Sequence, residues 1–477
     1  MKQIILFGAG FFGEAAYYKL SKFNDILFYV DNDKNKTGKS LHGIEIIDVP
    51  KLQQIYDAKI MDIVISSQYF IEIGNQLCNI GIYQYYVISD GLLYHKKQGE
   101  GMLPCVMGEP QYYSSKSDKK SILFVQNVAC IRTHKIASAL KKYGWNVFLA
   151  YSVTSPEQSN PEYANIYDEI FSISSIRQFI EFINKSDFDF IHSSNEPDFL
   201  TMILNQTNKT IIHDCHDLSS AYKSMSPEEM FIELEANRNS SGVIYTTKGI
   251  RDEALKKFNI PKEKTFVLEN LISQELAPQK KYKKISATDH ELHCVYEGGI
   301  VPHDKESHRY FEDIWKRLAD SGVHVHFYTN CDKEYCVYLE SLHEKIHYEG
   351  NFSSKQLAEE MTKYDVGLCI LNSTEKNKQY LEYASPNKIQ EYINAGIPVA
   401  IGNILSQKQF VEKNGFGKAI DFNGDIFEQI RNIVQIEIED NILQKKGLTL
   451  ESKIPKLINF YETCKYLKSV NNYTVVK

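Results

Sequence analysis

The sequence predicts an α/β protein made of three consecutive blocks, each built around a parallel β-sheet. Short apolar stretches typical of buried strands alternate with amphipathic stretches typical of helices along most of the 477 residues. This alternation starts afresh at Ser121 and again at Leu292. A polar segment at about Glu109–Lys120 is poor in apolar residues and predicts a linker between the first two blocks.

The first block, residues 1–110, opens with a strand, a helix and a second strand. We expect strands at Lys2–Phe7, Ile26–Val30, Asp62–Ser66 and Tyr85–Ile88, and a helix at Phe11–Phe23. This order predicts a small Rossmann-like unit of the kind that binds nucleotides.

The second and third blocks repeat the pattern over residues 119–275 and 276–430. In the second we expect strands at Ser121–Gln126, Asn146–Tyr151, Asp189–His192, Thr210–Asp214 and Thr265–Leu268, and a helix at Thr133–Tyr143. In the third we expect strands at His293–Glu297, His324–Tyr328, Val366–Leu371 and Val399–Ile401. Residues 431–477 are charged and helical in pattern. Two such blocks in tandem predict loops that converge at the carboxyl ends of their strands.

The composition excludes several classes of partner. A net charge of −7 gives no overall attraction to nucleic acid or to an anionic membrane. No apolar run reaches the length of a membrane span, and Met1 leads directly into a strand rather than a signal peptide. The nine cysteines are scattered, and Cys331 and Cys336 lack a second pair that would complete a zinc site. We therefore expect a cytoplasmic protein that associates at most peripherally with the inner face of a membrane.

The segment from Ser385 to Gly396 indicates function most directly. Ser385 is a good N-cap and Pro386 suits the first helical position, so a helix is expected to begin here. The unpaired first-turn amides and Lys388 suit a phosphate or diphosphate. Glu391, one to two turns into the helix, can accept hydrogen bonds from a ribose diol. The alternative is a capped amphipathic helix without a ligand.

This segment resembles the nucleotide-sugar-binding signature of GT-B glycosyltransferases, in particular the retaining group called family 4. The resemblance implies two facing Rossmann-like domains, a nucleoside diphosphate sugar as donor, and transfer that needs neither a metal nor another cofactor. It also implies that residues 431–477 cross back to the second block. By resemblance, Glu391 holds the donor ribose, and the turn Ser385-Pro386-Asn387 cradles the diphosphate. The family pattern has a further glutamate near the position of Tyr383, so that residue is missing here or displaced to Glu382.

A pair of glycines follows the first strand of the third block, in Tyr296-Glu297-Gly298-Gly299-Ile300. Glycine lets the backbone approach a ligand closely, and in the family this turn faces the donor diphosphate. The family usually places an arginine and a lysine just downstream, and here Lys305 and Arg309 are the available cations, with His303 and His308 beside them. Arg309 can bind a diphosphate through two parallel hydrogen bonds. The alternative is the solvated start of a helix.

In the second block, His213-Asp214-Cys215-His216-Asp217-Leu218 follows the strand residues Thr210–Ile212. Family 4 enzymes direct a histidine, often in a His-Asp pair, from this loop toward the donor sugar, and His216-Asp217 matches that pattern best. The resemblance therefore assigns a catalytic role to His216, with Lys388 and Glu391, and substrate contact to Asp217. A metal site is the alternative, because histidine and aspartate are also metal ligands.

The acceptor side of the second block departs from the family. A glycine-rich loop is usual after its first strand, whereas this chain has Asn127-Val128-Ala129-Cys130-Ile131-Arg132. Arg132, His134 and Lys135 could face an anionic or lipid-linked acceptor, or touch a membrane surface together with Lys141 and Lys142. The alternative is that these charges solvate one face of a helix.

The first block contains Gly8-Ala9-Gly10-Phe11-Phe12-Gly13 directly after a strand, and Asp31 ends the next strand. Glycines at these places permit a tight turn and a close approach to a pyrophosphate, and Asp31 could bind a ribose hydroxyl. The block is similar to small Rossmann-like domains attached to bacterial sugar-modifying enzymes, which bind NAD(P) or a nucleotide sugar. A match to Tyr-x-x-x-Lys, from Tyr112 to Lys116, lies in the polar linker and is better explained by chance. A purely structural unit is the alternative.

These observations predict a GT-B glycosyltransferase with an extra N-terminal Rossmann-like domain. It would transfer a sugar, with retention, to a glycan or glycolipid acceptor in bacterial surface polysaccharide synthesis, such as that of capsule or lipopolysaccharide. Three alternatives remain: an NAD(P)-dependent nucleotide-sugar oxidoreductase or dehydratase that uses the first block, a non-catalytic nucleotide-sugar-binding protein, and a GT-B epimerase.

Overall fold

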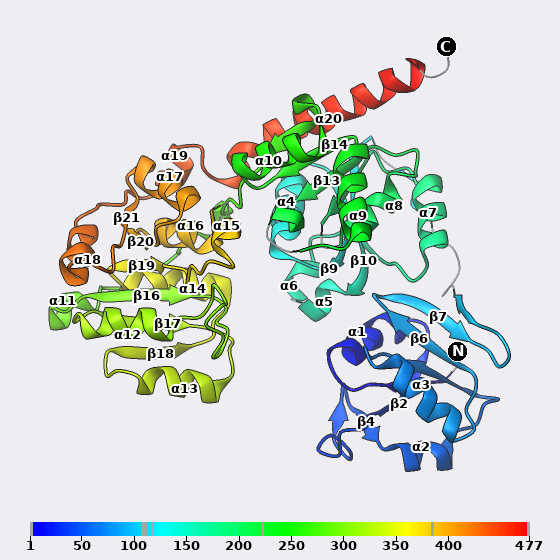
Figure 1. Cartoon of the computed structure of the whole chain (residues 1–477). Coiled ribbons are helices and arrows are strands. Elements are labelled where there is room, and N and C mark those ends of the chain that lie inside the picture. Colours follow the sequence, from blue (N-terminus) through cyan, green and yellow to red (C-terminus); the bar gives the residue numbers. More distant parts are fainter. Residues whose placement is uncertain are drawn as a thin grey trace. The chain divides into compact units, whose positions relative to one another are not determined.

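The computed structural model describes residues 3–105, 112–115, 118–159, 161–195, 197–221, 224–382 and 386–474. Internal contacts divide the chain into two compact units. The first contains Met1–His216, Phe231–Val243 and Tyr461–Lys477, and the second contains Asp217–Met230 and Ile244–Phe460. Figure 1 shows three β-sheets along the sequence, each flanked by helices.

The first sheet has eight strands in the order β3-β4-β2-β1-β5-β6-β7-β8. The strands are β1 (Gln3–Phe7), β2 (Asp25–Val30), β3 (Ser40–Leu41), β4 (Ile44–Ile47), β5 (Met61–Ile65), β6 (Tyr85–Ser89), β7 (Leu92–Lys96) and β8 (Met102–Pro104), with helices α1 (Phe11–Leu20), α2 (Val49–Ile55) and α3 (Phe70–Asn79). The prediction of a purely parallel unit was wrong at both edges, because β3 pairs antiparallel with β4, and β7 pairs antiparallel with β6 and β8. The five strands between them are parallel.

The second sheet has seven strands in the order β11-β10-β9-β12-β13-β14-β15. The strands are β9 (Ser121–Val128), β10 (Asn146–Thr154), β11 (Glu169–Ser172), β12 (Phe190–Ser194), β13 (Ile211–Cys215), β14 (Gly242–Tyr245) and β15 (Thr265–Val267). Its helices are α4 (Ile131–Lys142), α5 (Pro156–Ser159), α6 (Pro161–Ala164), α7 (Ile176–Lys185), α8 (Asp198–Leu204), α9 (Pro227–Asn239) and α10 (Lys248–Phe258). All pairings among β9–β13 are parallel, as predicted.

The third sheet has six parallel strands in the order β18-β17-β16-β19-β20-β21. The strands are β16 (His293–Glu297), β17 (His324–Tyr328), β18 (Ile346–Gly350), β19 (Val366–Cys369), β20 (Val399–Ile401) and β21 (Gly417–Ala419). The helices of this part are α11 (Ser286–Asp289), α12 (Glu312–Asp320), α13 (Lys333–Ser341), α14 (Ser354–Glu360), α15 (Lys378–Leu381), α16 (Asn387–Asn394), α17 (Leu405–Asn414), α18 (Ile426–Val434), α19 (Ile442–Lys445) and α20 (Leu450–Thr474). Side chains alternate between two apolar clusters, one containing Tyr296 and the other Val295.

The first sheet and strands β9–β13 of the second sheet belong to one compact unit and are joined by a buried lysine. Lys19 on α1 is 3% exposed. Its ammonium donates hydrogen bonds to the carbonyl oxygens of Ser152 and Ile173, both at 2.6 Å, and to that of Gly91. Gly91 has a φ of +77°, and a Cβ there would lie 1.7 Å from the oxygen of Ser152, so only glycine fits at this contact.

The linker and the C-terminal tail both contact the second sheet. Of the predicted linker, residues 109–111, 116 and 117 lie outside the described residues, whereas Tyr113 packs against Phe148 and Phe188. On α20, Tyr461 is buried against Trp145 and Phe190. Within the described part of the chain, no helix is long and apolar enough to cross a membrane.

Candidate functional site

The predicted glycine turn lies where the strand order of the third sheet reverses. From β16, the chain builds β17 and β18 on one side and β19, β20 and β21 on the other, so the switch point falls between β16 and β19. Open α/β sheets bind ligands at the carboxyl ends of the strands beside such a point. Gly298 follows the carboxyl end of β16 directly and has a φ of +125°, a conformation that favours glycine.

Both glycines leave room for a cation. A Cβ at Gly298 would lie 3.1 Å from Lys388 Nζ, and a Cβ at Gly299 would lie 2.7 Å from Arg309 Nη1. Tyr296 stabilises the turn, because its hydroxyl donates a 2.8 Å hydrogen bond to the carbonyl oxygen of Gly299. Two cations therefore reach one short stretch of backbone, and larger residues at the turn would displace them.

Lys388 reaches this turn from the first turn of α16. Its Nζ lies 3.8 Å from the centroid of the Tyr296 ring, which is a cation–π contact. Burial disfavours the charged form of Lys388, but nearby Tyr296 and Glu297 outweigh this effect and raise its pKa. Lys388 is therefore a cation at neutral pH, held against an aromatic face beside the two glycines.

Arg309 and His308 add to the positive field at the turn. Arg309 is exposed and lies at the end of the loop 301–309. The pKa of the half-buried His308 is lowered by burial first, then by the charges of Arg309 and Lys388. The loop is tied to the chain after β19, because Asn372 donates hydrogen bonds to the carbonyl oxygens of Lys305 and Ser307 at 2.8 and 3.0 Å.

The helix α16 begins one residue later than the sequence predicted. Pro386 is the N-cap, with an extended ψ of 134°, and Asn387 is the first helical residue. Pro386 was placed inside the helix, which was wrong, because a residue that keeps extended backbone precedes the first turn. Ser385, predicted as the N-cap, and Tyr383 lie outside the described residues.

Glu391 lies one turn beyond Lys388 on the half-buried side of α16. Within the part of the chain that the structure describes, its carboxylate has no hydrogen-bond or ion-pair partner. The neighbouring Gln390 fixes the helix, since it accepts a 2.8 Å hydrogen bond from the amide of Ile272 and donates one of 2.9 Å to the carbonyl of Asn270. Glu382 instead accepts a 3.2 Å hydrogen bond from the amide of Leu405, at the start of α17.

Two other predicted residues of this part lie apart from the turn. Lys305 is exposed in the middle of the loop, and no contact joins its ammonium to Gly298 or Gly299 among the described residues. His303 is turned toward α12 and α13, where its Nδ1 lies 3.3 Å from Glu312 and its ring packs against Tyr335. Arg309, rather than Lys305, is the cation that the loop brings to the glycines.

His216 and Asp217 follow β13, as predicted. The amide of His216 donates to the carbonyl of Asp214 and to the side chain of Asn195, both at 3.2 Å, which fixes the start of the loop. His216 and Asp217 fall on the border between the two compact units, so their role toward the donor stays a prediction. No group of three candidate metal ligands among the described residues includes His213 or His216.

Arg132 is not available to an acceptor in this structure. It lies in the first turn of α4 and donates hydrogen bonds of 2.8 and 2.9 Å to the two carboxylate oxygens of Asp214 on β13. His192 on β12 contacts the same carboxylate at 3.2 Å and the hydroxyl of Tyr461 at 2.8 Å. Burial raises the pKa of Asp214, but Arg132 and then His192 outweigh it, so the pKa lies far below its usual range. The switch point of the second sheet is thus occupied by a buried ion-pair network.

The N-terminal glycine turn has the geometry that its residues predicted. Gly8 has a φ of +122°, and a Cβ at Gly13 would lie 1.9 Å from the carbonyl oxygen of Gly8, so the turn and helix pack without side chains. Gly10 caps α1. Asp31, however, already accepts a 2.9 Å hydrogen bond from the amide of Ala9 and a 3.0 Å contact from Lys36.

Sequence reasoning missed several residues of the third-sheet site. Tyr296 was quoted only as part of a motif, yet its hydroxyl binds the carbonyl of Gly299 and its ring makes a cation–π contact with Lys388. Tyr392 on α16 donates its hydroxyl to the carbonyl of Leu368 at 3.3 Å and accepts the amide of Glu297 at 3.0 Å. The aromatic residues at these positions were the available signal, because a tyrosine next to a glycine turn can brace it.

Three family models match parts of the chain. Residues 131–276 match the family model Glycosyltransferase Family 4, residues 315–446 match Glucosyltransferase 3-like, C-terminal domain, and residues 1–88 match C2185-like, N-terminal. No curated protein matches the chain in sequence.

Solved structures share the fold at low identity. A glycosyltransferase from Rickettsia africae is 12% identical, with a TM-score of 0.53, and the match covers 73% of this chain and 99% of that one. Sucrose-phosphate synthase from Thermosynechococcus elongatus is 16% identical, with a TM-score of 0.47, over 75% of this chain and 99% of that one. The family models give the activity and the first of these structures gives the fold: the chain is a glycosyltransferase of GT-B fold that resembles family 4, with an additional N-terminal Rossmann-like domain.

Proposed function

We propose that the protein transfers a sugar from a nucleoside diphosphate sugar to a glycan or glycolipid acceptor, with retention of configuration and without a catalytic metal. One observation carries the proposal: Lys388 and Arg309 meet at the Gly298-Gly299 turn, at the switch point of the third sheet. Two cations beside half-buried glycine backbone suit a diphosphate, which carries its charge on several oxygens.

In this proposal the charges act on the leaving group. The bond between the anomeric carbon of the sugar and the diphosphate oxygen breaks, and the electron pair stays on the diphosphate. Lys388, Arg309 and the first amides of α16 stabilise that negative charge as it develops. The acceptor hydroxyl then bonds to the anomeric carbon on the same face and gives its proton to the departing diphosphate. The protein contributes position and charge rather than a covalent intermediate.

The remaining predicted residues take roles around this centre. Glu391 would accept hydrogen bonds from the ribose diol, since its carboxylate is half-buried one turn beyond Lys388. His216, with Asp217, would orient the donor sugar near its reacting carbon. Gly298 and Gly299 supply close backbone. We further propose that the product belongs to a bacterial surface polysaccharide and that the protein works at the cytoplasmic side of the membrane.

We also propose that the N-terminal domain binds a nucleotide or a nucleotide sugar at Gly8, Gly10 and Gly13. The close packing of Gly13 on Gly8 supports a bare turn that a pyrophosphate can approach. Asp31 would have to exchange Lys36 for a ribose hydroxyl. Calorimetric titration with NAD, NADP and UDP-sugars, compared with the Gly10→Glu variant, tests this role: binding of any of these ligands to the wild type alone supports it.

The main test is release of nucleotide from a panel of UDP-, GDP- and CMP-sugars, with and without acceptor. We expect release from a nucleoside diphosphate sugar, and none from a CMP-sugar, which has only one phosphate. Lys388→Ala should lower kcat by about 10²–10³-fold, as for the loss of one donor to a developing charge. Glu391→Ala should remove most of the remaining affinity for the donor.

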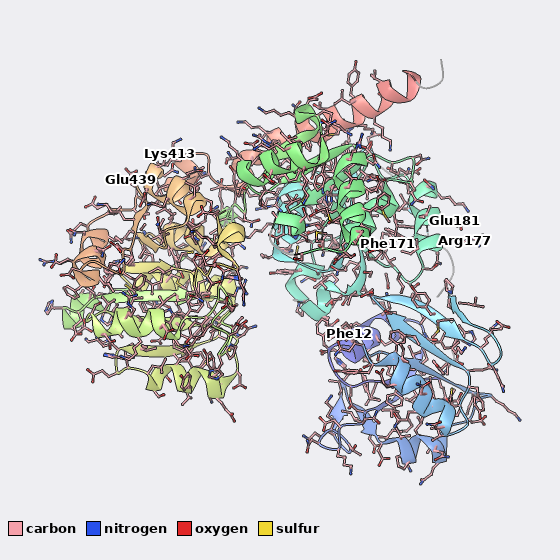
Figure 2. All side chains as sticks on the ribbon, viewed as in Figure 1. Phe12, Phe171, Arg177, Glu181, Lys413 and Glu439 are labelled. Atoms are coloured by element: carbon pink, nitrogen blue, oxygen red, sulfur yellow. The ribbon has the colours of Figure 1, made fainter. Side chains whose placement is uncertain are left out.

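Matched controls come from the same part of the chain. Lys413 at the end of α17 and Glu439 are exposed, and Figure 2 labels both. Lys413→Ala and Glu439→Ala should leave nucleotide release unchanged. Tight binding of a nucleotide sugar without release would favour a binding protein, and a change in NADH absorbance with a nucleotide sugar would favour an oxidoreductase; either result would overturn the proposal.

A further inference from the structure

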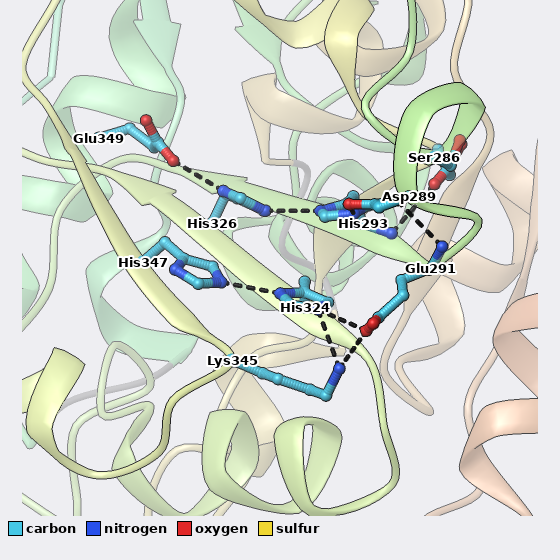
Figure 3. A network of polar contacts seen from close by, with 10 residues as sticks. Ser286, Asp289, Glu291, His293, His324, His326, Lys345, His347 and Glu349 are labelled. Atoms are coloured by element: carbon cyan, nitrogen blue, oxygen red, sulfur yellow. Dashed lines mark hydrogen bonds and ion pairs between the residues drawn. The ribbon is translucent and has the colours of Figure 1, made fainter.

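Four histidines lie on one face of the third sheet, at the amino-terminal end of its strands. They are His293 on β16, His324 and His326 on β17, and His347 on β18, and we call them the histidine ladder. His293 pairs in register with His324, and His326 pairs with His347. His324 and His326 are two residues apart on one strand, so their side chains share a face. Figure 3 shows the rings side by side across the three strands.

Each of three ladder histidines has a carboxylate on one ring nitrogen. Asp289 Oδ2 lies 2.9 Å from His293 Nε2, Glu291 Oε2 lies 2.7 Å from His324 Nε2, and Glu349 Oε1 lies 2.7 Å from His326 Nδ1. A carboxylate only accepts, so His293 Nε2 and His326 Nδ1 carry the protons of their rings. The inner nitrogens of His293 and His326 then present lone pairs, whereas His324 Nδ1 lies 2.8 Å from His347 Nε2. Histidines that bind metals are held by a carboxylate in this way.

The inner nitrogens of His293 and His326 then face each other with nothing between them. His293 Nδ1 and His326 Nε2 are 2.9 Å apart. With both outer nitrogens protonated, two lone pairs meet at this distance, and their repulsion requires a shared proton or a cation. Both side chains are buried, with 3% and 6% of their surface exposed, so the charge would have to be balanced locally.

The local charges match a divalent cation. Asp289, Glu291 and Glu349 carry three negative charges around the ladder, and Lys345, which contacts Glu291 and lies 2.9 Å from His324 Nε2, carries one positive charge. The nearby ion pairs Lys284–Asp365 and Lys363–Glu360 each sum to zero, so two negative charges are left over. A single extra proton neutralises one of them, whereas a divalent ion neutralises both.

We propose that His293, His324 and His326 bind one divalent transition-metal ion, of which Zn²⁺ is the best match. Ligand atoms of all three residues lie within 4.8 Å of one another. Imidazole nitrogens bind zinc at about 2.0–2.1 Å, which places two ligand nitrogens roughly 3.3 Å apart in a tetrahedral site. The 2.9 Å pair would therefore open by only about half an ångström to admit the ion. Imidazole is a preferred ligand of zinc, and its three-histidine sites are well known as a class.

The role of this ion is structural rather than catalytic. His293 begins β16, whereas Gly298 follows the other end of the same strand. The ladder and the glycine turn proposed for transfer therefore lie at opposite ends of the strands. An ion held by His293 and His326 would tie β16 to β17. It would stabilise the third sheet against unfolding without entering the transfer reaction.

The test uses the full chain after removal of metal with a chelator and dialysis. Titration with zinc against a chromogenic chelator should show one tightly bound ion per chain, and the melting temperature should rise with zinc. Co²⁺ should give the visible absorption of a tetrahedral site. His293→Ala and His326→Ala should each abolish tight binding and the zinc-dependent rise in melting temperature. His343→Ala, a histidine near the ladder that contacts Asp320 at 3.8 Å, is the control and should bind zinc as the wild type does.

A second pair of variants guards against misfolding of the alanine variants. Asp289→Asn and Glu349→Gln keep the size of the side chains but weaken the hold on the ring protons, and each should lower the affinity for zinc by about 10–100-fold. The proposal is overturned if the wild type binds no stoichiometric zinc, or if His293→Ala and His326→Ala bind it as tightly as the wild type. A ladder that shares a proton instead would give a melting temperature that depends on pH and not on zinc.

Discussion

The second and third sheets place cations at the same topological position but use them differently. In the second sheet, Arg132 reaches the switch point and is bound by both oxygens of Asp214, deep in the structure. In the third, Lys388 rests on the ring of Tyr296, and Arg309 is exposed, both beside glycines. The strand orders are equivalent. The cation at the switch point of the second sheet thus has a buried carboxylate partner, whereas the cations at that of the third sheet lie beside an aromatic ring and two glycines.

The largest expected effect comes from removing Arg132 from the switch point of the second sheet. Among the described side chains, Arg132→Met leaves His192 as the partner of the buried Asp214 charge, and removal of one partner of a buried pair costs about 3–5 kcal/mol. Denaturant unfolding followed by circular dichroism measures this loss. Arg177→Met on α7 removes an exposed arginine, labelled in Figure 2, and should change stability by less than about 0.5 kcal/mol. Equal effects from the two variants would remove the distinction between the switch points.

The same pair predicts a dependence on acid. Because the pKa of Asp214 is lower in the folded chain than in the unfolded one, its contribution is present above about pH 4 and is lost as the pH falls toward the folded value. The wild type should therefore lose more stability between about pH 6 and pH 3 than the Asp214→Asn variant, which has no carboxyl to protonate. Urea unfolding at several pH values measures the two slopes, and parallel slopes would contradict the assignment.

The next largest effect tests the switch point of the third sheet. Arg309→Met should lower kcat for nucleotide release by about a hundredfold, because it removes one cation from the developing charge. Lys305→Met, four residues earlier in the same loop, should change kcat little, since its ammonium does not reach the glycines. Steady-state kinetics with the active nucleotide sugar measure both. A larger loss for Lys305→Met would show that the loop presents the other cation when a donor binds.

A third cation, Lys19, has carbonyl oxygens as partners instead of a carboxylate or glycines. Lys19 is buried among the oxygens of Gly91, Ser152 and Ile173, and Lys19→Met leaves them without a donor, which should cost about 1–3 kcal/mol. Burial lowers the pKa of Lys19 to about 7, well below its value in the unfolded chain. The unfolded chain then binds the extra proton above about pH 7, so stability should rise with pH up to about pH 10 in the wild type relative to the variant. Thermal unfolding across this range measures the difference, and no relative rise would contradict the lowered pKa.

Sequence reasoning succeeded where a pattern is local and failed where partners are distant. The strands His293–Glu297 and His324–Tyr328 were predicted to the residue, because apolar side chains alternate and the flanks are polar. The glycines at 298 and 299 marked a turn that lies beside Lys388 and Arg309, because a larger residue there would meet those side chains. Their role toward a donor stays a prediction. The antiparallel β7 and β8 were not predicted, since pairing direction depends on a turn geometry that the local pattern does not specify.

Distant contacts explain the remaining misses. Arg132 was weighed as an acceptor contact or a solvated charge, because its partner Asp214 lies 82 residues away. The histidine ladder likewise joins residues from three strands, and only the register of those strands brings the rings together. Such sites follow from packing and register, which a single sequence does not reveal.

The smallest expected effect concerns Glu391, and it tests whether the switch point of the third sheet binds the ribose of the donor. Glu391→Gln keeps the size of the side chain but weakens hydrogen bonds from a ribose diol to a charged acceptor, worth about 1.5 kcal/mol, so KM for the donor should rise roughly tenfold. The value of kcat should change little, because the ribose is bound equally in the ground and transition states.

The control for this prediction is the sugar of the nucleotide. A 2′-deoxyribose analogue of the donor should bind wild type and Glu391→Gln with similar affinity, since the hydroxyl that the carboxylate would accept is missing. If Glu391→Gln lowers kcat as strongly as Arg309→Met and leaves KM unchanged, Glu391 acts on the reacting diphosphate or sugar instead. In that case α16 would place two groups, Lys388 and Glu391, at the reaction itself, and the ribose would be bound elsewhere in the third sheet.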